Sequence, residues 1–573
     1  MKLVSIEIGE KFRSLHAGFY VDFHSLSEDS LNDMPKFQPF CFVGLNGSGK
    51  SNVLEAIAAI FYHLEMCVAK FQPKSFEKYF RREICSVDAF VLKYLTCSHN
   101  KKYYVPTLAD LVTISKKKGE APVMTSSTVM GNFRSMLLYW AYPFTSKQPI
   151  RDMSLIPPEN QELPAPGKEY LPDIVVGYSS GENEILSLPF IKNKLVHFDE
   201  YKEAVIKDYA YYEPETSLVY IDSEMSQAVL LSILLFENEE TLKPIEKELD
   251  IKGVRSFRMN LNLHRLYHEK EKRKEFPILQ QLEPQLSKLK KCASSWFSNS
   301  DIMWLDFFVD DNTKKAFRDN FNSSLDLFRL FQVLYELNLR IVKDSIKEEV
   351  YSSKGYYTDG KLPTGSPEQN VFYFLDYLII KEDKETQKSI ELLLRNFSDG
   401  EHQFLHTMGI CLMLKERSCL LLLDEPETHF NPGWRAKFIK VLNDSIKAEG
   451  GNNMMKEVLI TSHSPFIISD CMPNNVIYFE KDEETGRMSA LSADKLGFKT
   501  YGRSVDDISQ RFFKYDLSIG EYSNKELENI DFENIDTLDD VMNTKRAIRH
   551  LGDSIEKDLV LARLNQLLSK FKN

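Results

Sequence analysis

The sequence predicts an α/β fold in which a mostly parallel sheet is split by a largely helical insertion and followed by a small helical extension. An apolar run at 39–43 ends in glycine, as a buried parallel strand would, and a helical apolar pattern follows at 51–65. Two further strand-like runs, at 419–423 and 458–461, alternate with helical patterns much later in the chain. We therefore expect two halves of one α/β core on either side of the insertion.

Length and composition limit the classes of protein that fit. The chain has 573 residues, of which 43% are hydrophobic and 27% charged, which is typical of a folded protein with two or three lobes. The formal net charge of -12 means that contact with nucleic acid would need a local basic patch. The 8 cysteines lack zinc-like spacing, so we expect reduced, mostly buried thiols. No apolar run of about 18 residues occurs, and we expect a cytoplasmic protein without membrane contact.

The remaining expected elements follow in chain order. Strand-like runs before the insertion lie at 3–8, 19–23, 173–178 and 217–222. We expect residues 1–236 to form the N-terminal half of the core and 237–369 to form the helical insertion and a loop. Residues 370–480 then form the C-terminal half of the core, and 481–573 form an extension for assembly or partner docking.

A glycine-rich loop follows the apolar run at 39–43. Residues 44–51 read G-x-x-x-x-G-K-S between an expected strand and an expected helix, which is the context of a phosphate-binding loop. Glycines let successive backbone N–H groups surround an anion, and the helix N-terminus adds a favourable dipole. The expected nucleotide-binding residues are Gly44, Asn46, Gly47, Ser48, Gly49, Lys50 and Ser51. Lys50 would contact the β- and γ-phosphates and the Ser51 hydroxyl would bind Mg²⁺, so the expected ligands are ATP and Mg²⁺.

Two carboxylates stand at the end of the apolar strand at 419–423. Ligands of open parallel sheets bind at this end of the strands. Asp424 suits a water-mediated contact to Mg²⁺, and Glu425 suits a base that polarises the attacking water. The alternative, an acidic helix cap, would leave the pairing with the glycine-rich loop unexplained.

Two more motifs flank these carboxylates in sequence. Ser398, Gly400 and Glu401 open an apolar helical stretch, where a second anion site or a plain helix cap is expected. His463 follows the strand at 458–461 and is a candidate sensor of the γ-phosphate, although a lone histidine is usually structural.

In this order the four motifs resemble those of ABC-type ATPases of the RecF, SMC and overcoming-lysogenization-defect kind. The resemblance implies Walker A at Lys50 and Ser51, the signature motif at Ser398, Gly400 and Glu401, Walker B at Asp424 and Glu425, and the switch loop at His463. It also implies a head-to-tail dimer in which the signature motif of one subunit completes the ATP site of the other. Asn431 would then lie near the crossing between subunits.

The chain departs from the family pattern at some positions. Asp399 stands where a second glycine is common, and a second signature-like string at 178–182 is interpreted as a structural loop. The Q-loop residue is open between Gln227 and Asn183. The interval between Walker A and Walker B is too short for the long coiled-coil arms of SMC proteins.

The insertion, the string at 178–182 and the tail are also similar to those of PtuA-like ATPases, which are restriction-system-associated and belong to the Septu and retron anti-phage systems. This resemblance implies a separate HNH nuclease partner (PtuB-like) and, in some members, a retron reverse transcriptase with its DNA. No D-x-D or H-N-H pattern follows His463, so we expect an ATPase without a nuclease site of its own. The alternative is a RecF/SMC-like DNA-repair ATPase or scaffold whose ATP state gates DNA binding.

Surface patterns indicate how the chain would meet its partners, which include at least a second copy in a homodimer or higher homo-oligomer. An apolar stripe on the last helix consists of Ile555, Leu559, Leu564, Leu567, Leu568 and Phe571. This stripe would pack on its own core or bind a partner. The basic candidates for nucleic acid are Arg81, Arg82, Lys116, Lys117 and Lys118, with a second cluster at 265–274.

Overall fold

The computed structural model describes residues 1–26, 37–69, 72–96, 108–130, 140–143, 167–180, 186–207, 217–266, 278–353, 362–363, 365–383, 386, 388–415, 417–447, 455–515 and 519–572. Contacts divide the chain into two compact units, residues 1–501 and 502–573. The domain boundaries expected from the sequence stay predictions.

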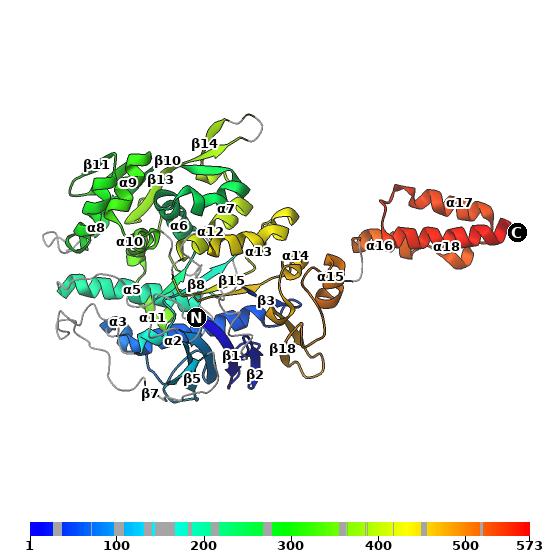
Figure 1. The fold of residues 1–573 in the computed structure, drawn as a ribbon, viewed down its shortest axis with the longest axis horizontal. Coiled ribbons are helices and arrows are strands. Elements are labelled where there is room, and N and C mark those ends of the chain that lie inside the picture. The colour runs from blue at the N-terminus through cyan, green and yellow to red at the C-terminus, as the bar shows by residue number, and fades with distance from the viewer. Residues whose placement is uncertain are drawn as a thin grey trace. The chain divides into compact units, whose positions relative to one another are not determined.

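A seven-stranded sheet forms the centre of the first unit (Figure 1). Its order is β18 (Met488–Ser492), β17 (Val476–Lys481), β3 (Phe40–Val43), β16 (Lys456–Thr461), β15 (Cys419–Asp424), β8 (Ile174–Ser179) and β9 (Leu218–Tyr220). All neighbours pair in parallel except β17 and β18. Because β3 pairs directly with β16, the two halves of the predicted α/β core are joined in one sheet, which confirms the predicted fold class.

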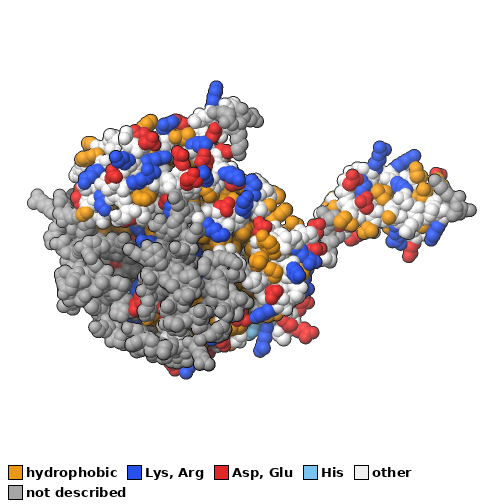
Figure 2. All heavy atoms as spheres, in the orientation of Figure 1, with side chains coloured by type: hydrophobic (Ala, Val, Ile, Leu, Met, Phe, Trp, Pro, Cys, Tyr) orange, Lys and Arg blue, Asp and Glu red, His pale blue; other side chains and the backbone are white. Residues whose placement is uncertain are grey.

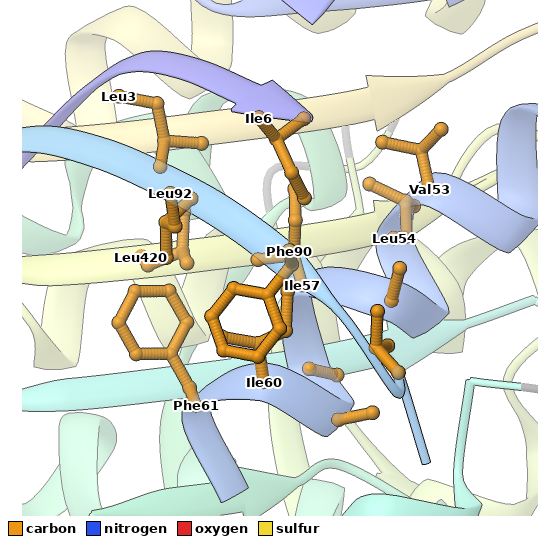
Figure 3. Close-up of a cluster of buried hydrophobic side chains, with 14 of the residues drawn as sticks. Leu3, Ile6, Val53, Leu54, Ile57, Ile60, Phe61, Phe90, Leu92 and Leu420 are labelled. Carbon is orange, nitrogen blue, oxygen red and sulfur yellow. The ribbon is translucent and has the colours of Figure 1, made fainter. Parts of the chain in front are cut away.

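The helix α2 (Lys50–Val68) leaves β3 through the glycine-rich loop and is almost wholly buried. Apolar side chains of α2, β15, β1 (Lys2–Ile8) and β4 (Phe90–Thr96) meet in one cluster that includes Leu3, Ile57, Phe90 and Leu420 (Figure 3). Among the described residues, α2 is the one helix long and apolar enough to span a membrane, but 89% of that stretch is buried inside the protein. It therefore gives only weak evidence of a membrane segment.

A second, antiparallel sheet lies against α2. It has the order β2 (Phe19–Asp22), β1, β4, β5 (Leu108–Lys116), β6 (Val123–Met130) and β7 (Trp140–Pro143). The expected strands at 3–8 and 19–23 are confirmed as β1 and β2. The later strands lie in a stretch whose mixed composition carried no clear period, so the sequence did not predict them.

The insertion contains more than helices. Its helices are α7 (Glu239–Leu249), α8 (Ile278–Cys292), α9 (Asp311–Asn320), α10 (Ser324–Glu336) and α11 (Asp344–Ser352). A third sheet has the order β11 (Ser295–Ser298), β12 (Ile302–Phe308), β10 (Ile251–Asn262), β13 (Phe372–Glu382) and β14 (Ser389–Leu393). Because β10 pairs with β13 from beyond residue 370, this sheet depends on a contact between distant segments.

The described part of the first unit contains further helices, some of which pack on other helices and some on the central sheet. They are α3 (Lys74–Glu77), α5 (Leu188–Lys207), α6 (Ser223–Phe236), α12 (Asp399–Met413), α13 (Pro432–Ile446) and α14 (Pro465–Ser469). The seven described cysteines, which are Cys41, Cys67, Cys85, Cys292, Cys411, Cys419 and Cys471, are buried free thiols, as expected. Cys97 lies outside the described residues.

The second unit is helical, as predicted, and comprises α15 (Val505–Phe513), α16 (Glu521–Glu528), α17 (Leu538–Ala547) and α18 (Ile555–Lys572). The residues of the apolar stripe predicted on the last helix lie in two different environments, one buried and one exposed. Leu564 is buried in the core of this unit, and Leu567 and Leu568 pack against that core. Ile555 and Leu559 are 65% and 66% exposed. The side chain of Phe571 lies outside the described part.

Candidate functional site

The loop between β3 and α2 requires glycine at three positions. Gly44, Gly47 and Gly49 have φ angles of 141°, 75° and 90°, which other residues rarely adopt. A Cβ on Gly44 would also lie 2.3 Å from the carbonyl oxygen of Phe479 on β17. Asn46 is exposed at the tip of this loop. The backbone conformation is therefore specific to glycine, as the motif predicted.

Two polar side chains of this loop are buried where a phosphate group would bind. The Nζ atom of Lys50 donates hydrogen bonds to the carbonyl oxygens of Gly44 and Leu45, at 2.9 and 3.0 Å. Burial lowers the pKa of Lys50, and the nearby Glu425 and Asp424 oppose this shift. The buried Oγ of Ser48 has no hydrogen-bond partner within the described part of the chain. These donors fit the oxygens of a bound phosphate.

The structure brings Ser51 and Asp424 together from opposite ends of the core. The Ser51 hydroxyl donates to Oδ1 of Asp424 at 2.9 Å, and the Thr461 hydroxyl donates to the same oxygen at 2.6 Å. Burial raises the pKa of Asp424, and both hydrogen bonds oppose this shift. A hydroxyl beside a carboxylate is the kind of oxygen pair that Mg²⁺ uses together with substrate phosphates. The donor set therefore fits Mg²⁺.

Glu425 directly follows β15 with an unusual backbone conformation. Its φ angle is 48°, in the left-handed region, and its N–H donates to the Thr461 hydroxyl at 3.0 Å. Ser180 holds the same turn, because its N–H donates to the Asp424 carbonyl at 3.1 Å and its hydroxyl donates to the Glu425 carbonyl. Such backbone strain is a feature of functional turns. Ser180 belongs to the string at 178–182, whose later residues lie outside the described chain.

His463 faces this turn from the end of β16. Its Nε2 lies 3.5 Å from Oε1 of Glu425. Burial lowers the pKa of His463 to about 4, and the positive charge of Lys50 acts in the same direction. The imidazole is therefore neutral near pH 7.

The predicted signature motif forms the start of α12. Ser398 is the N-cap, and its side chain and that of Glu401 form a capping box. Burial acts to raise the pKa of Glu401, but hydrogen bonds from Lys381 and Ser398 outweigh it and hold the pKa below its usual value. A Cβ on Gly400 would lie 2.8 Å from the carbonyl oxygen of His429, so the motif packs tightly on the loop after β15.

These contacts make Ser398 a helix cap, which was one of the two expected roles. Ser398 is nevertheless exposed, and it stands at the N-terminus of a 15-residue helix. Asn431 caps α13 nearby in the same loop, since its side chain accepts a hydrogen bond from the N–H of Trp434 at 2.9 Å. The contact of the signature motif with a second subunit stays a prediction.

Hydrogen bonds connect Gln227 to the insertion and to the strand β13 that follows it. Its side chain accepts from the Tyr335 hydroxyl at 3.4 Å, and its carbonyl accepts from the Tyr377 hydroxyl at 2.7 Å. These partners lie on α10 and β13, so its role in a Q-loop is still a prediction. Asn183, the other candidate, lies outside the described residues.

Sequence reasoning missed two residues of the site. Thr461 connects Asp424 to the turn at Glu425, and Glu427 is buried beside the His463 loop. Polar residues at the ends of the two apolar strands, in the runs 461–464 and 424–429, were the signals that could have revealed Thr461 and Glu427 respectively.

The parallel sheet, the glycine-rich loop, and the carboxylate and hydroxyl groups at the ends of the neighbouring strands β15 and β16 are the features of a P-loop ATPase. The AAA ATPase domain family matches residues 1–468, and the chain belongs to this family.

Comparison with individual proteins gives more distant similarities. Protein ea59 of Escherichia phage lambda is 22% identical over 157 residues, which are 27% of this chain and 28% of the phage protein. An Smc head bound to the C-winged helix domain of ScpA aligns with 87% of this chain and 98% of its own, at 11% identity and a TM-score of 0.29. The recombination mediator protein RecF with ATPrS aligns with 86% and 98%, at 12% identity and a TM-score of 0.26. TM-scores this low do not establish a shared overall fold.

Proposed function

We propose that the chain is the ATP-binding and ATP-hydrolysing subunit of a cytoplasmic anti-phage defence complex, which controls a separate HNH-type nuclease through ATP-dependent dimerisation of its heads. The observation that supports the ATP site is the meeting of Ser51 with Asp424 beside Lys50. The defence role rests on the resemblance to PtuA-like ATPases of the Septu and retron systems. A retron reverse transcriptase with its DNA is a further partner under this proposal.

Each side chain has a defined task in hydrolysis. Lys50 and the loop N–H groups bind the phosphates, and Ser51 with Asp424 would hold Mg²⁺, which neutralises phosphate charge when bound. The Glu425 carboxylate accepts a proton from the attacking water. Neutral His463, 3.5 Å from that carboxylate, orients groups near the γ-phosphate.

The charges of the described surface favour a protein partner over extended contact with nucleic acid. Lys116, one of the basic candidates, is 3% exposed and donates to the carbonyl oxygens of Glu83 and Asp88 at 2.8 and 3.1 Å. Lys118 pairs with Glu10 at 3.5 Å. Basic and acidic side chains are interspersed over the coloured surface (Figure 2). The described part of the second basic cluster ends at residue 266.

The test is to read the genes adjacent to that of this chain and to reconstitute the chain with an HNH-type nuclease that they encode. The two proteins should co-purify, and nuclease activity should differ between wild type and the hydrolysis-deficient Glu425→Gln variant at saturating ATP. Lack of any complex, together with ATP-dependent binding of the isolated chain to gapped DNA, would favour the DNA-repair alternative instead.

A further inference from the structure

A second carboxylate is buried in the turn that follows β15. Glu427, in the same turn as Glu425, is only 4% exposed. One of its oxygens accepts a hydrogen bond from the Ser462 hydroxyl, and an interaction with the backbone of His463 also favours its ionised form. A buried carboxylate is costly unless its environment compensates for lost hydration. Its position therefore needs an explanation beyond packing.

The Ser462 hydroxyl connects this carboxylate to the loop that carries His463. Ser462 is completely buried, and its Oγ also accepts a hydrogen bond from the N–H of Ser464 at 2.9 Å. The hydroxyl of the residue before His463 thus binds the backbone of the residue after it while donating to Glu427. This chain of hydrogen bonds restrains the loop backbone on either side of the imidazole.

This link is separate from the contact between His463 and Glu425. His463 and Glu425 face each other at 3.5 Å, which is a long distance for a hydrogen bond and a weak restraint by itself. The Glu427–Ser462 hydrogen bond joins the same two loops from the buried side. Misplacement by about 1 Å in a catalytic site costs roughly 100-fold in rate, so a buried restraint of this kind has a direct kinetic effect.

We infer that Glu427 and Ser462 are positioning residues, which hold His463 against Glu425 for the hydrolysis step. The inference rests on the proposed hydrolysis of ATP at Glu425 and goes beyond it by assigning the group that aligns the two loops. Both side chains are buried, so we expect their loss to lower kcat and leave ATP affinity nearly unchanged.

The experiment uses full-length protein with Glu427→Ala, Glu427→Gln and Ser462→Ala. The alanine variant of Glu427 should lower kcat about 10- to 100-fold, with KM and the Kd of a fluorescent ATP analogue within about threefold of wild type. Glu427→Gln should recover most of this loss, because its amide oxygen can still accept the Ser462 hydrogen bond. Ser462→Ala should reproduce the alanine phenotype and provides a second route if Glu427→Ala does not fold.

A double-mutant cycle with His463→Ala separates positioning from a merely structural role. If Glu427 acts through His463, adding Glu427→Ala to His463→Ala should give no further loss of kcat. Multiplicative losses in the double variant, or wild-type kcat in both Glu427→Ala and Ser462→Ala, would overturn the inference. Failure of the proposed function has a different signature, because Glu425→Gln would then hydrolyse ATP at the wild-type rate.

Discussion

Ser51 and Asp424 are 373 positions apart in sequence and share a hydrogen bond of 2.9 Å. At the scale of single residues, the site consists of polar groups that lie close together, and burial shifts the pKa of its lysine and of its Walker B aspartate. Burial lowers the pKa of Lys50 and raises that of Asp424. The mutual attraction of these charges opposes both shifts, so a change at one residue should affect the others.

Lys50→Ala should weaken ATP binding by about 10- to 100-fold, because it removes charge-assisted hydrogen bonds to the phosphates. Titration with a fluorescent ATP analogue measures this change. Lys495→Ala is a suitable control, since this lysine is exposed and pairs with Asp22. Undiminished affinity of Lys50→Ala would contradict the assignment of the phosphate loop.

Glu425→Gln should retain ATP affinity and lose about 100- to 10,000-fold in kcat, because an amide keeps the shape of the side chain but cannot accept the proton of water. Steady-state phosphate release, together with nucleotide binding, measures both quantities. Hydrolysis at the wild-type rate would show that another group is the base.

The buried Glu427 predicts a dependence of stability on pH. Burial raises the pKa of Glu427 from 4.5 to about 7, so the folded chain binds this proton more tightly than the unfolded chain. The contribution to stability is present below about pH 4.5 and is lost as the pH rises through about 7. The Tm of Glu427→Gln relative to wild type should therefore be higher at about pH 8 than at about pH 5. If the curves of Tm against pH for Glu427→Gln and wild type ran parallel, they would contradict this prediction.

At the scale of elements, α18 has a part that packs into a core and a part that is exposed. Leu564 is buried in the core of the second unit, whereas Ile555 and Leu559 are exposed on an earlier turn. Deleting residues 550–573 would therefore remove part of that core as well as any docking surface. Single substitutions separate the two effects.

The double variant Ile555→Asp with Leu559→Asp should fold normally and lose the nuclease partner, because exposed apolar side chains contribute little to folding and much to binding. Circular dichroism and co-purification measure the two outcomes. Gln566→Asp, on the same helix, is the matched control, and Leu564→Ala should destabilise the unit by about 2–5 kcal/mol. Full co-purification of the double variant would show that the docking surface lies elsewhere, and the 237–350 lobe would be the next candidate.

At the scale of the whole molecule, the proposed activity depends on two copies of the chain. Ser398 is exposed at the start of α12, where an anion would meet the helix dipole. One copy would therefore present this surface to the ATP bound at Lys50 of another. The nucleotide would then become part of the contact between the subunits.

The Glu425→Gln protein should form dimers in ATP and monomers without nucleotide, as measured by size-exclusion chromatography with light scattering. Adding Ser398→Asp should abolish the dimer, because its charge would repel the γ-phosphate while the aspartate still caps the helix. Ser398→Asn caps equally well without charge and should retain the dimer. If Ser398→Asp and Ser398→Asn dimerised equally, the contact between the subunits would lie away from Ser398.

The sequence by itself determined the local parts of this protein. The strand at 40–43, the glycine conformations of the loop and the apolar strand before Asp424 depend on residue types within a few positions, and the structure confirms them. Only the tertiary structure decided the pairing of β10 with β13 and the link between Glu427 and Ser462. Strand pairing and burial depend on partners far away in the chain, and hydrophobic periodicity does not record which distant segments meet.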